Sequence, residues 1–293
     1  MKYNEFHTKS ACNKVSNKNL PYKWDLNIYR GCEHGCKYCF AIYTNQYLNS
    51  NNFTEEIFIK SNIIEMLENQ LNSKKWKHEL INLGGITDSY QPIEKQMKIM
   101  PEIIKLLINY KTPCTISTKS ALILRDKDLL NKLSDVTYVN IAITITTLND
   151  KLRSMLEPYS STIEDRIKII ESFSSSHLRV GIHIMPIMPF INDDIDSLEE
   201  IFCIARKYNV DYIDTEPLNL FGPTKFHYFT FLKRHYPNLI SKYDAIFTKG
   251  RVSNDYIKNL NFKIDRLREK YNYPKLERKD LNKIKEHEQL TFF

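Results

Sequence analysis

The alternation of short apolar runs with amphipathic segments constrains the fold more than any other feature of this 293-residue chain. Between about residues 24 and 217, stretches with strand composition take turns with stretches in which apolar residues recur at helical spacing. Such alternation indicates βαβ units and a parallel sheet that helices cover on its outer face. The expected strands are 25–29, 80–83, 114–117, 138–145, 179–185 and 212–215, and the expected helices are 63–71, 94–110, 126–133, 163–173 and 197–208.

This pattern predicts an α/β fold in which six strand–helix units form a partial (β/α)6 barrel, because a closed barrel of this type has about eight units. No repeat, low-complexity tract or Pro/Gly/Ser-rich linker divides the chain. The last seventy or so residues break the alternation and are charged and rich in Lys and Tyr. We therefore expect an N-terminal segment over 1–22, the barrel over 23–220, and a mostly helical C-terminal extension over 221–293.

Composition excludes several classes of protein. With 42% apolar and 26% charged residues, the chain is globular rather than disordered, collagen-like or a coiled coil. No apolar run is long enough to span a bilayer, and the polar N-terminus has no secretory h-region, so we expect a cytoplasmic protein. The net charge of +7 fits a nucleic-acid partner, and it fits equally a lysine-rich surface that reflects genome composition.

Three of the six cysteines follow the first expected strand at C-x3-C-x2-C spacing: Cys32, Cys36 and Cys39. Three thiolates on one short loop can hold a single soft-metal centre, and thiolates are the ligands of iron–sulfur clusters. Only three ligands would leave one metal position open for a chelating cofactor or substrate. A structural zinc site is the alternative, and it would need a fourth, more distant ligand.

The triad, with an aromatic residue before its last cysteine and a (β/α)6 pattern behind it, resembles the radical S-adenosylmethionine (SAM) superfamily. In that superfamily the open iron of a [4Fe-4S] cluster chelates SAM, and reductive cleavage yields a 5′-deoxyadenosyl radical that abstracts a substrate hydrogen. The resemblance implies that Cys32, Cys36 and Cys39 are cluster ligands and that Tyr38 lies near the adenine. It also implies an external one-electron reductant of the flavodoxin or ferredoxin type.

Later segments are similar to the spore photoproduct lyase-like branch, also described as DNA repair photolyases. They are Thr87–Glu94, Ser117–Ser120 continuing through Leu122–Asp126, and Leu156–Pro158, and the similarity covers roughly residues 23–219. The branch implies DNA repair, or another reaction on nucleic acid, as the function. A radical SAM enzyme that modifies a peptide, RNA or small molecule is the alternative, and a non-catalytic metal-binding nucleic-acid module is a third possibility.

The same resemblance implies a set of cofactor contacts. Backbone at Gly84 and Gly85 would contact the methionine amino group, and Lys119, with Ser117 on the same side of its strand, would contact the carboxylate. Thr144 is the expected ribose ligand and Met185 lies where the adenine runs. As alternatives that the residues themselves leave open, Lys119 can be simply solvated, Thr144 can bond to backbone, and Met185 can be a core residue.

Glycine is scarce, with seven residues in the chain, and five of them fall in these segments: Gly31, Gly35, Gly84, Gly85 and Gly181. Because glycine lets backbone approach another group closely, we interpret their placement as contacts with the cluster or the cofactor. Asp88, Tyr90 and Gln91 are expected to contact the substrate. The alternative for that segment is a helix N-terminus, which Asp88 or Ser89 would cap.

The chain departs from spore photoproduct lyases at two places. Those enzymes carry a hydrogen-donating cysteine on the second-strand loop, where this chain has Gly84-Gly85-Ile86, and a tyrosine where this chain has Phe40. Cys114 is a weak candidate for a substitute catalytic donor, although a lone cysteine among apolar neighbours is usually a small buried hydrophobe. His183, on an apolar strand, is expected to be a satisfied core histidine.

Two features of the C-terminal region suggest partners. The terminal Gln289, Leu290, Phe292 and Phe293 resemble the peptide that docks bacterial repair proteins onto the sliding clamp, and the alternative is an apolar end folded onto its own domain. A basic and aromatic segment over 256–271 could follow a phosphate backbone, although a solvated helix face explains it almost as well.

Overall fold

The computed structural model describes residues 1–17, 20–47, 50 and 52–275. Its centre is a seven-stranded sheet in the order β10-β9-β8-β7-β6-β3-β2. All neighbours in this sheet are parallel except β2, which runs antiparallel to β3. The strands are β2 (Cys12–Lys14), β3 (Trp24–Leu26), β6 (Ile81–Leu83), β7 (Cys114–Thr118), β8 (Val139–Thr144), β9 (Arg179–Ile187) and β10 (Tyr212–Pro217).

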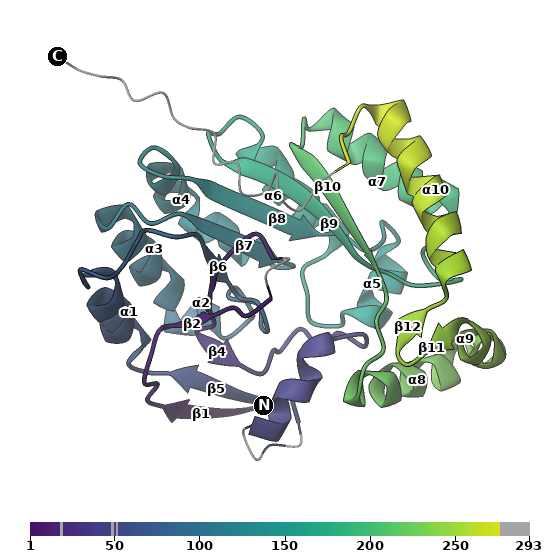
Figure 1. Ribbon diagram of the computed structural model, residues 1–293, viewed down its shortest axis with the longest axis horizontal. Helices are drawn as coiled ribbons and strands as arrows, with labels where there is room; N and C mark the ends of the chain where they lie inside the picture. Colours follow the sequence, from purple (N-terminus) through teal and green to yellow (C-terminus); the bar gives the residue numbers. More distant parts are fainter. Residues whose placement is uncertain (18–19, 48–49, 51, 276–293) are drawn as a thin grey trace.

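Helices cover the outer face of this sheet, so its six parallel strands make a curved, incomplete barrel (Figure 1). The edge strands β10 and β2 do not pair with each other, which leaves one side of the barrel open. The fold therefore confirms the predicted partial (β/α)6 barrel. The covering helices are α1 (Ile63–Leu71), α2 (Glu94–Met97), α3 (Ile99–Asn109), α4 (Lys127–Ser134), α6 (Ile163–Phe173) and α7 (Ile195–Lys207), with a 3-10 turn η2 (Ala121–Asp126) before α4. Helix α5 (Asp150–Leu156) instead packs with the cysteine loop, because its Leu156 is buried in one cluster with Cys36 and Tyr38.

The predicted helix over 94–110 is two helices, because Lys98 adopts a left-handed conformation with φ of 52° between α2 and α3. Apolar side chains of α3, among them Met100, Ile103 and Leu107, are completely buried against the sheet, as their helical spacing predicts. Helix α5 was not predicted; Asn149 caps it by accepting a hydrogen bond from the Leu152 amide at 3.0 Å.

The N-terminal residues take part in two sheets. Strand β1 (Lys2–Phe6) pairs in parallel with β5 (Glu56–Lys60), and β5 pairs antiparallel with β4 (Tyr29–Arg30), so these three form a small sheet of their own. Because β4 leads directly into the cysteine triad, this sheet anchors the start of the triad's loop. The sequence pattern did not predict it. A 3-10 helix, η1 (Phe40–Tyr47), follows the triad.

The C-terminal extension is mostly helical: α8 (Pro223–His235), η3 (Pro237–Leu239), α9 (Ile240–Ile246), a small hairpin β11 (Phe247–Thr248) and β12 (Arg251–Val252), and α10 (Asn254–Tyr271). Helix α8 contacts η1, and α10 packs on α7. In Figure 1 these elements lie together beside the β10 edge of the barrel. Among the described residues, no helix has the length and apolar character needed to cross a bilayer.

Candidate active site

A cavity of about 500 Å³ occupies the interior of the open barrel. It extends from the cysteine loop, at the carboxyl ends of the strands, to Leu80 and Tyr138, which precede β6 and β8. Most of the residues that the sequence singled out line it together: Cys32, Cys36, Tyr38, Cys39, Gly84, Gly85, Asp88, Ser117, Lys119, Thr144 and Met185. The barrel thus gathers segments from five different strand ends at one place, where barrel chemistry is usually found.

The cysteine loop begins at a glycine that no other residue could replace. Gly31 has a φ of 82°, and a Cβ added there would lie 2.6 Å from the Glu56 carbonyl oxygen. The next amide, that of Cys32, donates to the Phe53 carbonyl at 2.9 Å. The loop therefore turns away from β4 tightly against the small sheet, which aims the triad toward the barrel.

The three triad thiols are free, and all of them line the cavity. Burial raises the pKa of Cys32, Cys36 and Cys39 to about 12, so a bound cation is needed to hold them as thiolates at neutral pH. Among the described residues, no three Cys, His, Asp or Glu side chains converge on a single metal ion. Thiols grouped at one end of a larger cavity match the donor set of a multi-iron cluster, whose ligands each bind a different iron.

The segment after β6 holds the cysteine loop from one side. The Thr87 hydroxyl donates to the Gly31 carbonyl at 2.7 Å, and the Gln91 side-chain amide donates to the same carbonyl at 3.3 Å. Gln91 also accepts from the Glu33 amide at 2.9 Å. Both ends of the Gln91 side chain are thus committed to the loop, so its role is to position the triad.

Asp88 lies at the centre of a second group of contacts with the loop. Its carboxylate pairs with the His34 ring at 2.9 Å and accepts from the Thr118 hydroxyl at 2.9 Å and from the Tyr90 and Lys119 amides at 2.9 and 2.8 Å. Burial alone would raise the pKa of Asp88, but the His34 ring and these donors outweigh it and lower the pKa to about 2. Asp88 therefore stays ionised and ties the cysteine loop to the end of β7.

Residues after α5 hold the loop from the other side. The Lys37 amide donates to the Leu156 carbonyl at 2.8 Å, and the Tyr38 hydroxyl donates to the Glu157 carboxylate. Glu157 and Arg166 form an ion pair in which both side chains are fully buried. Burial would raise the pKa of Glu157, yet the neighbouring cations lower it to about 2. A charged pair inside the protein thus fixes the aromatic residue of the triad.

Lys119 lies between the contacts made by Asp88 and those made by the residues around Glu157. Its carbonyl accepts from the Ser161 amide at 3.1 Å, and its ammonium lies 5.9 Å from the centroid of the Tyr38 ring. Burial would lower the pKa of Lys119, but Cys36 and Glu157 raise it above its ordinary value. The cavity therefore contains a cation beside the triad that remains charged at physiological pH.

The Gly84–Gly85 turn shows why glycine is needed there. Gly84 has a φ of 88°, and its amide donates to the Leu26 carbonyl at 2.9 Å. A Cβ on Gly85 would lie 2.4 Å from a carboxylate oxygen of Asp25, which also accepts from the Asn82 side chain at 2.8 Å. The close neighbour of Gly85 is thus the protein's own carboxylate. The sequence indicated the glycine but not Asp25, which lies 60 residues earlier.

Ser117, Thr144 and Met185 line the cavity from β7, β8 and β9. Gly181, on the same strand as Met185, does not serve a ligand directly: a Cβ there would lie 2.1 Å from the Tyr212 ring. At Gly181, therefore, the expected contact with a ligand is replaced by a packing role, because the missing side chain makes room for the Tyr212 ring of the neighbouring strand.

Several polar residues of the cavity were missed by sequence reasoning. The Asn140 amide donates to the Thr115 hydroxyl and to the Tyr212 hydroxyl, each at 2.9 Å. His183 lines the cavity beside Asp214, its partner in the β9–β10 register, and burial lowers the pKa of His183. It faces the cavity rather than a core, contrary to expectation. Alternation along each strand was the available signal, since residues two apart point to the same face.

Three predicted residues do not line the cavity. Tyr90 and Gln91 are completely buried beneath the loop, so the expected substrate contact is replaced by a role in support. Cys114 is also completely buried, and it alternates with Thr115, whose side chain lines the cavity, so its thiol faces the covering helices. The terminal residues Gln289, Leu290, Phe292 and Phe293 lie outside the described residues.

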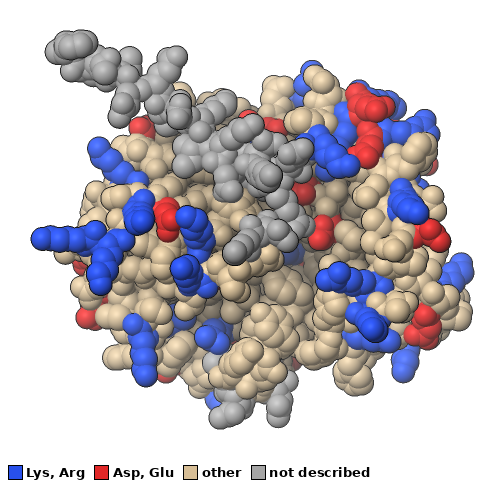
Figure 2. All heavy atoms as spheres, viewed as in Figure 1, with Lys and Arg blue, Asp and Glu red and all other residues tan. Residues whose placement is uncertain are grey.

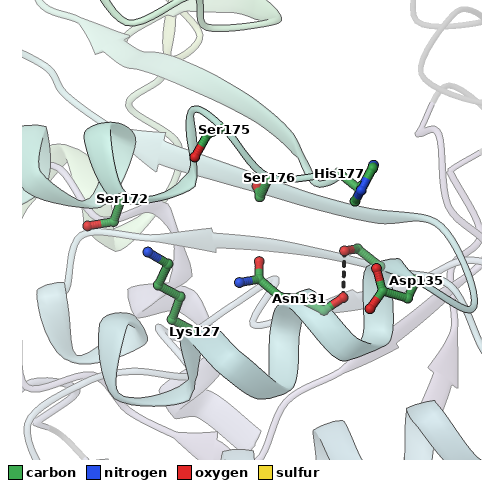
Figure 3. A pocket seen from close by; sticks show the side chains of 8 residues that line it. Lys127, Asn131, Asp135, Ser172, Ser175, Ser176 and His177 are labelled. Atoms are coloured by element: carbon green, nitrogen blue, oxygen red, sulfur yellow. Dashed lines mark hydrogen bonds between the residues drawn. The ribbon is translucent and has the colours of Figure 1, made fainter.

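A second hollow, of about 280 Å³, lies on the outer surface between α4 and the loop that leads into β9. Its polar side chains, among them Lys127, Asp135 and His177, point in different directions rather than toward one point (Figure 3). The hydrogen bond drawn there joins a serine hydroxyl of α4 to the Asn131 carbonyl one turn earlier, at 2.7 Å. This hollow does not assemble reactive groups in the way that the barrel cavity does.

Comparisons with known sequences agree with this geometry. The family model described as the radical SAM superfamily matches residues 26–202. The uncharacterized protein Rv2578c of Mycobacterium tuberculosis is 30% identical over 252 residues, which cover 85% of this chain and 74% of that protein. The uncharacterized protein MJ0683 of Methanocaldococcus jannaschii is 29% identical over 215 residues, covering 73% of this chain and 77% of that one.

Comparisons with solved structures give the same fold. A spore photoproduct lyase mutant with bound AdoMet and dinucleoside spore photoproduct matches with a TM-score of 0.69 and 15% identity, covering 92% of this chain and 79% of that chain. A spore photoproduct lyase complexed with dinucleoside spore photoproduct matches with a TM-score of 0.68 and 14% identity over the same shares. At this level of identity the likeness establishes a common fold.

Proposed function

The chain belongs to the radical SAM superfamily, whose cofactors are a [4Fe-4S] cluster and SAM, and from that premise we propose that it abstracts a hydrogen atom from a nucleic acid. When bound, the cluster and SAM supply a 5′-deoxyadenosyl radical. The observation that carries the proposal is the convergence of the triad, Lys119, the Gly84–Gly85 turn and three strand residues on one cavity. A radical intermediate needs a site recessed within the protein, which limits competing reactions.

The chain's own residues have distinct tasks in this proposal. Cys32, Cys36 and Cys39 would hold the [4Fe-4S] cluster. The Lys119 ammonium binds the methionine carboxylate as a point charge, and the backbone at Gly84–Gly85 binds the methionine amino group.

Thr144, on β8, would bind the ribose, and Met185, on β9, would contact the adenine; both line the cavity. Tyr38 borders the adenine, and its hydroxyl is held by Glu157, so its ring cannot turn away. Ser117, on β7, lies two residues before Lys119, and both side chains line the cavity, so Ser117 would add a polar group beside the carboxylate.

Nucleic acid is the proposed substrate for two reasons. The solved proteins of the same fold bind a dinucleoside photoproduct, and the net charge of +7 suits a polyanionic partner. Among the described residues, the triad provides the only thiols that line the cavity, so in this proposal a group other than a thiol returns the hydrogen atom. We therefore propose a repair or modification reaction that differs from spore photoproduct lyase in its final hydrogen transfer.

Anaerobic reconstitution with iron and sulfide, followed by reduction in the presence of SAM, tests the chemistry. We expect 5′-deoxyadenosine from the wild type, none from Cys36→Ala, and an unchanged yield from the matched control Cys203→Ala, whose thiol is exposed on α7. An intact cluster that yields no 5′-deoxyadenosine would refute the enzymatic role.

Deuterated DNA, RNA and protein, each added separately, then identify the substrate class. Label should appear in 5′-deoxyadenosine only with the polymer that supplies the hydrogen atom. Transfer of label from protein alone would show a peptide-modifying enzyme instead of one that acts on nucleic acid.

A further inference from the structure

The positive charge of the chain is concentrated in residues 217–253, a stretch whose first residues, Pro217 to Asn219, line the cavity. Between residues 217 and 253 there are six Lys and Arg residues and one acidic residue, Asp244, in a chain whose whole net charge is +7. All six basic side chains are exposed: Lys225, Lys233, Arg234, Lys242, Lys249 and Arg251. Figure 2 shows Lys and Arg side chains over the region of α8, α9 and the β11–β12 hairpin, at the lower right.

These six cations form no ion pair with any residue that the structure describes. Helix α10, which sequence reasoning offered as a phosphate-binding segment, differs in this respect. Its Lys263 donates to the Asp193 carbonyl at 2.8 Å, its Arg268 pairs with Asp265, and its Lys270 pairs with Glu199. Much of the charge on α10 is thus already used within the protein, whereas the charge around α8 is available to a partner.

Exposed aromatic side chains lie in the same stretch of chain as these six cations. The Phe226 side chain is 80% exposed on α8, and Phe221, just before the helix, is 49% exposed. The Arg251 guanidinium lies 5.6 Å from the centroid of the Phe221 ring. Exposed rings of this size usually mark a binding surface, because leaving them in water is unfavourable.

The start of α8 lies next to the cysteine loop and the active-site cavity. The Thr224 hydroxyl, in the first turn of α8, donates to the Cys39 carbonyl at 3.2 Å and so ties the helix to the triad. Phe40, which directly follows Cys39 in the chain, lines the cavity and is 58% exposed. Asn219, shortly before Phe221, lines the cavity as well. Residues close to the start of α8, Phe40 and Asn219, therefore belong to the wall of the cavity.

We propose that this α8 surface, comprising Phe40, Phe221, Lys225, Phe226, Lys249 and Arg251, binds single-stranded nucleic acid and leads one nucleotide into the cavity. The inference rests on the proposed nucleic-acid substrate and adds its form and its binding surface. Unpaired Lys and Arg residues bind phosphates, and exposed rings bind bases by stacking. A duplex hides its base faces, so rings interleaved with cations favour an unpaired strand.

Fluorescence anisotropy with the reconstituted protein measures binding of labelled deoxythymidine and uridine oligomers of about 12 nucleotides. The affinity for single strands scales with salt concentration to a power of about −0.7 for each phosphate contact. Lys225→Gln/Arg251→Gln removes two such contacts, so it should reduce the slope of log affinity against log salt by about 1.4 and weaken binding roughly 25-fold at about 0.1 M salt. The matched control Lys258→Gln/Arg266→Gln removes two charges from α10, where Arg266 also lies over an exposed ring, and should leave affinity unchanged.

Phe226→Ala separates stacking from charge. It should weaken single-strand binding at least about fivefold while the salt slope stays the same. Because this ring is mostly exposed, the substitution leaves the fold intact, which circular dichroism verifies. Equal losses in the two double variants, tighter binding of a duplex, or no effect of Phe226→Ala would each overturn the proposal. SAM cleavage needs no oligomer, so a failure here is distinguishable from a failure of the radical chemistry.

Discussion

Replacing Arg166 by methionine tests whether the buried ion pair behind Tyr38 supports the fold. Arg166 and Glu157 are both fully buried, and Arg166 also donates to the Thr144 carbonyl at 2.8 Å and to the Ser161 carbonyl at 3.1 Å. Arg166→Met keeps the apolar stem but leaves a carboxylate inside the protein without its main partner. Breaking a buried pair in this way costs about 3–5 kcal/mol.

Urea unfolding of the cluster-free, reduced protein at neutral pH, followed by circular dichroism, measures this cost. With an m-value of about 3 kcal/mol/M, the midpoint should fall by roughly 1–1.7 M. The matched control is Lys168→Met, on the same helix, where a half-exposed lysine pairs with Glu164 at 2.8 Å. An exposed pair contributes about 0–1 kcal/mol, so this midpoint should hardly move.

A double variant distinguishes the cost of an unpaired buried charge from the cost of lost packing. Glu157→Gln/Arg166→Met removes both ions, so part of the stability lost in Arg166→Met should return. If Arg166→Met unfolds at the same urea concentration as Lys168→Met, the pair does not carry the energy assigned to it. If the double variant is no better than Arg166→Met, the loss arises from packing and not from an unpaired carboxylate.

Further predictions concern four positions. Lys119→Met should retain its iron but bind SAM about 10- to 100-fold more weakly by calorimetry, since a hydrogen bond to a charged group is lost; unchanged affinity would exclude the carboxylate contact. Gln91→Ala removes the loop's hydrogen bonds, so a chelator should extract iron roughly tenfold faster, and an unaltered rate would contradict its positioning role. Gly181→Ala should lower Tm by about 3–9 °C, because the new methyl group overlaps the Tyr212 ring; no change would mean that the ring moves freely. Burial lowers the pKa of Lys60 from 10.5 to about 8, so between these pH values the unfolded chain keeps a proton that the folded protein has lost. The free energy of unfolding should therefore rise by about 3 kcal/mol as the pH increases from about 8 to 10.5. Urea midpoints measured across this pH range should show the rise in the wild type and not in Lys60→Met.

The sequence predicted the barrel because parallel strands buried on both faces are short apolar runs, which are visible without knowledge of their partners. It did not predict the small sheet of β1, β4 and β5, since two-residue β4 has no periodicity to recognise. Nor did it predict the break at Lys98, because a left-handed conformation at a lysine leaves no mark in composition.

The triad could be found because its three cysteines are close in the chain. The roles of Asp88 and Gln91 could not, because their partners His34 and Glu33 lie more than fifty residues earlier. Spacing along the chain therefore located the reactive groups, while the residues that hold them in place required the tertiary structure.

If the substrate is the proposed nucleic acid, the unpaired edges of the barrel have a consequence for its topology. A closed barrel can be entered only from an end, so a chain would have to thread in by a terminus. Because β10 and β2 are not hydrogen-bonded to each other, the proposed nucleic acid would need no free terminus, and an internal stretch would enter as a bulged loop. A circular oligonucleotide should consequently be as good a substrate as a linear one of the same sequence.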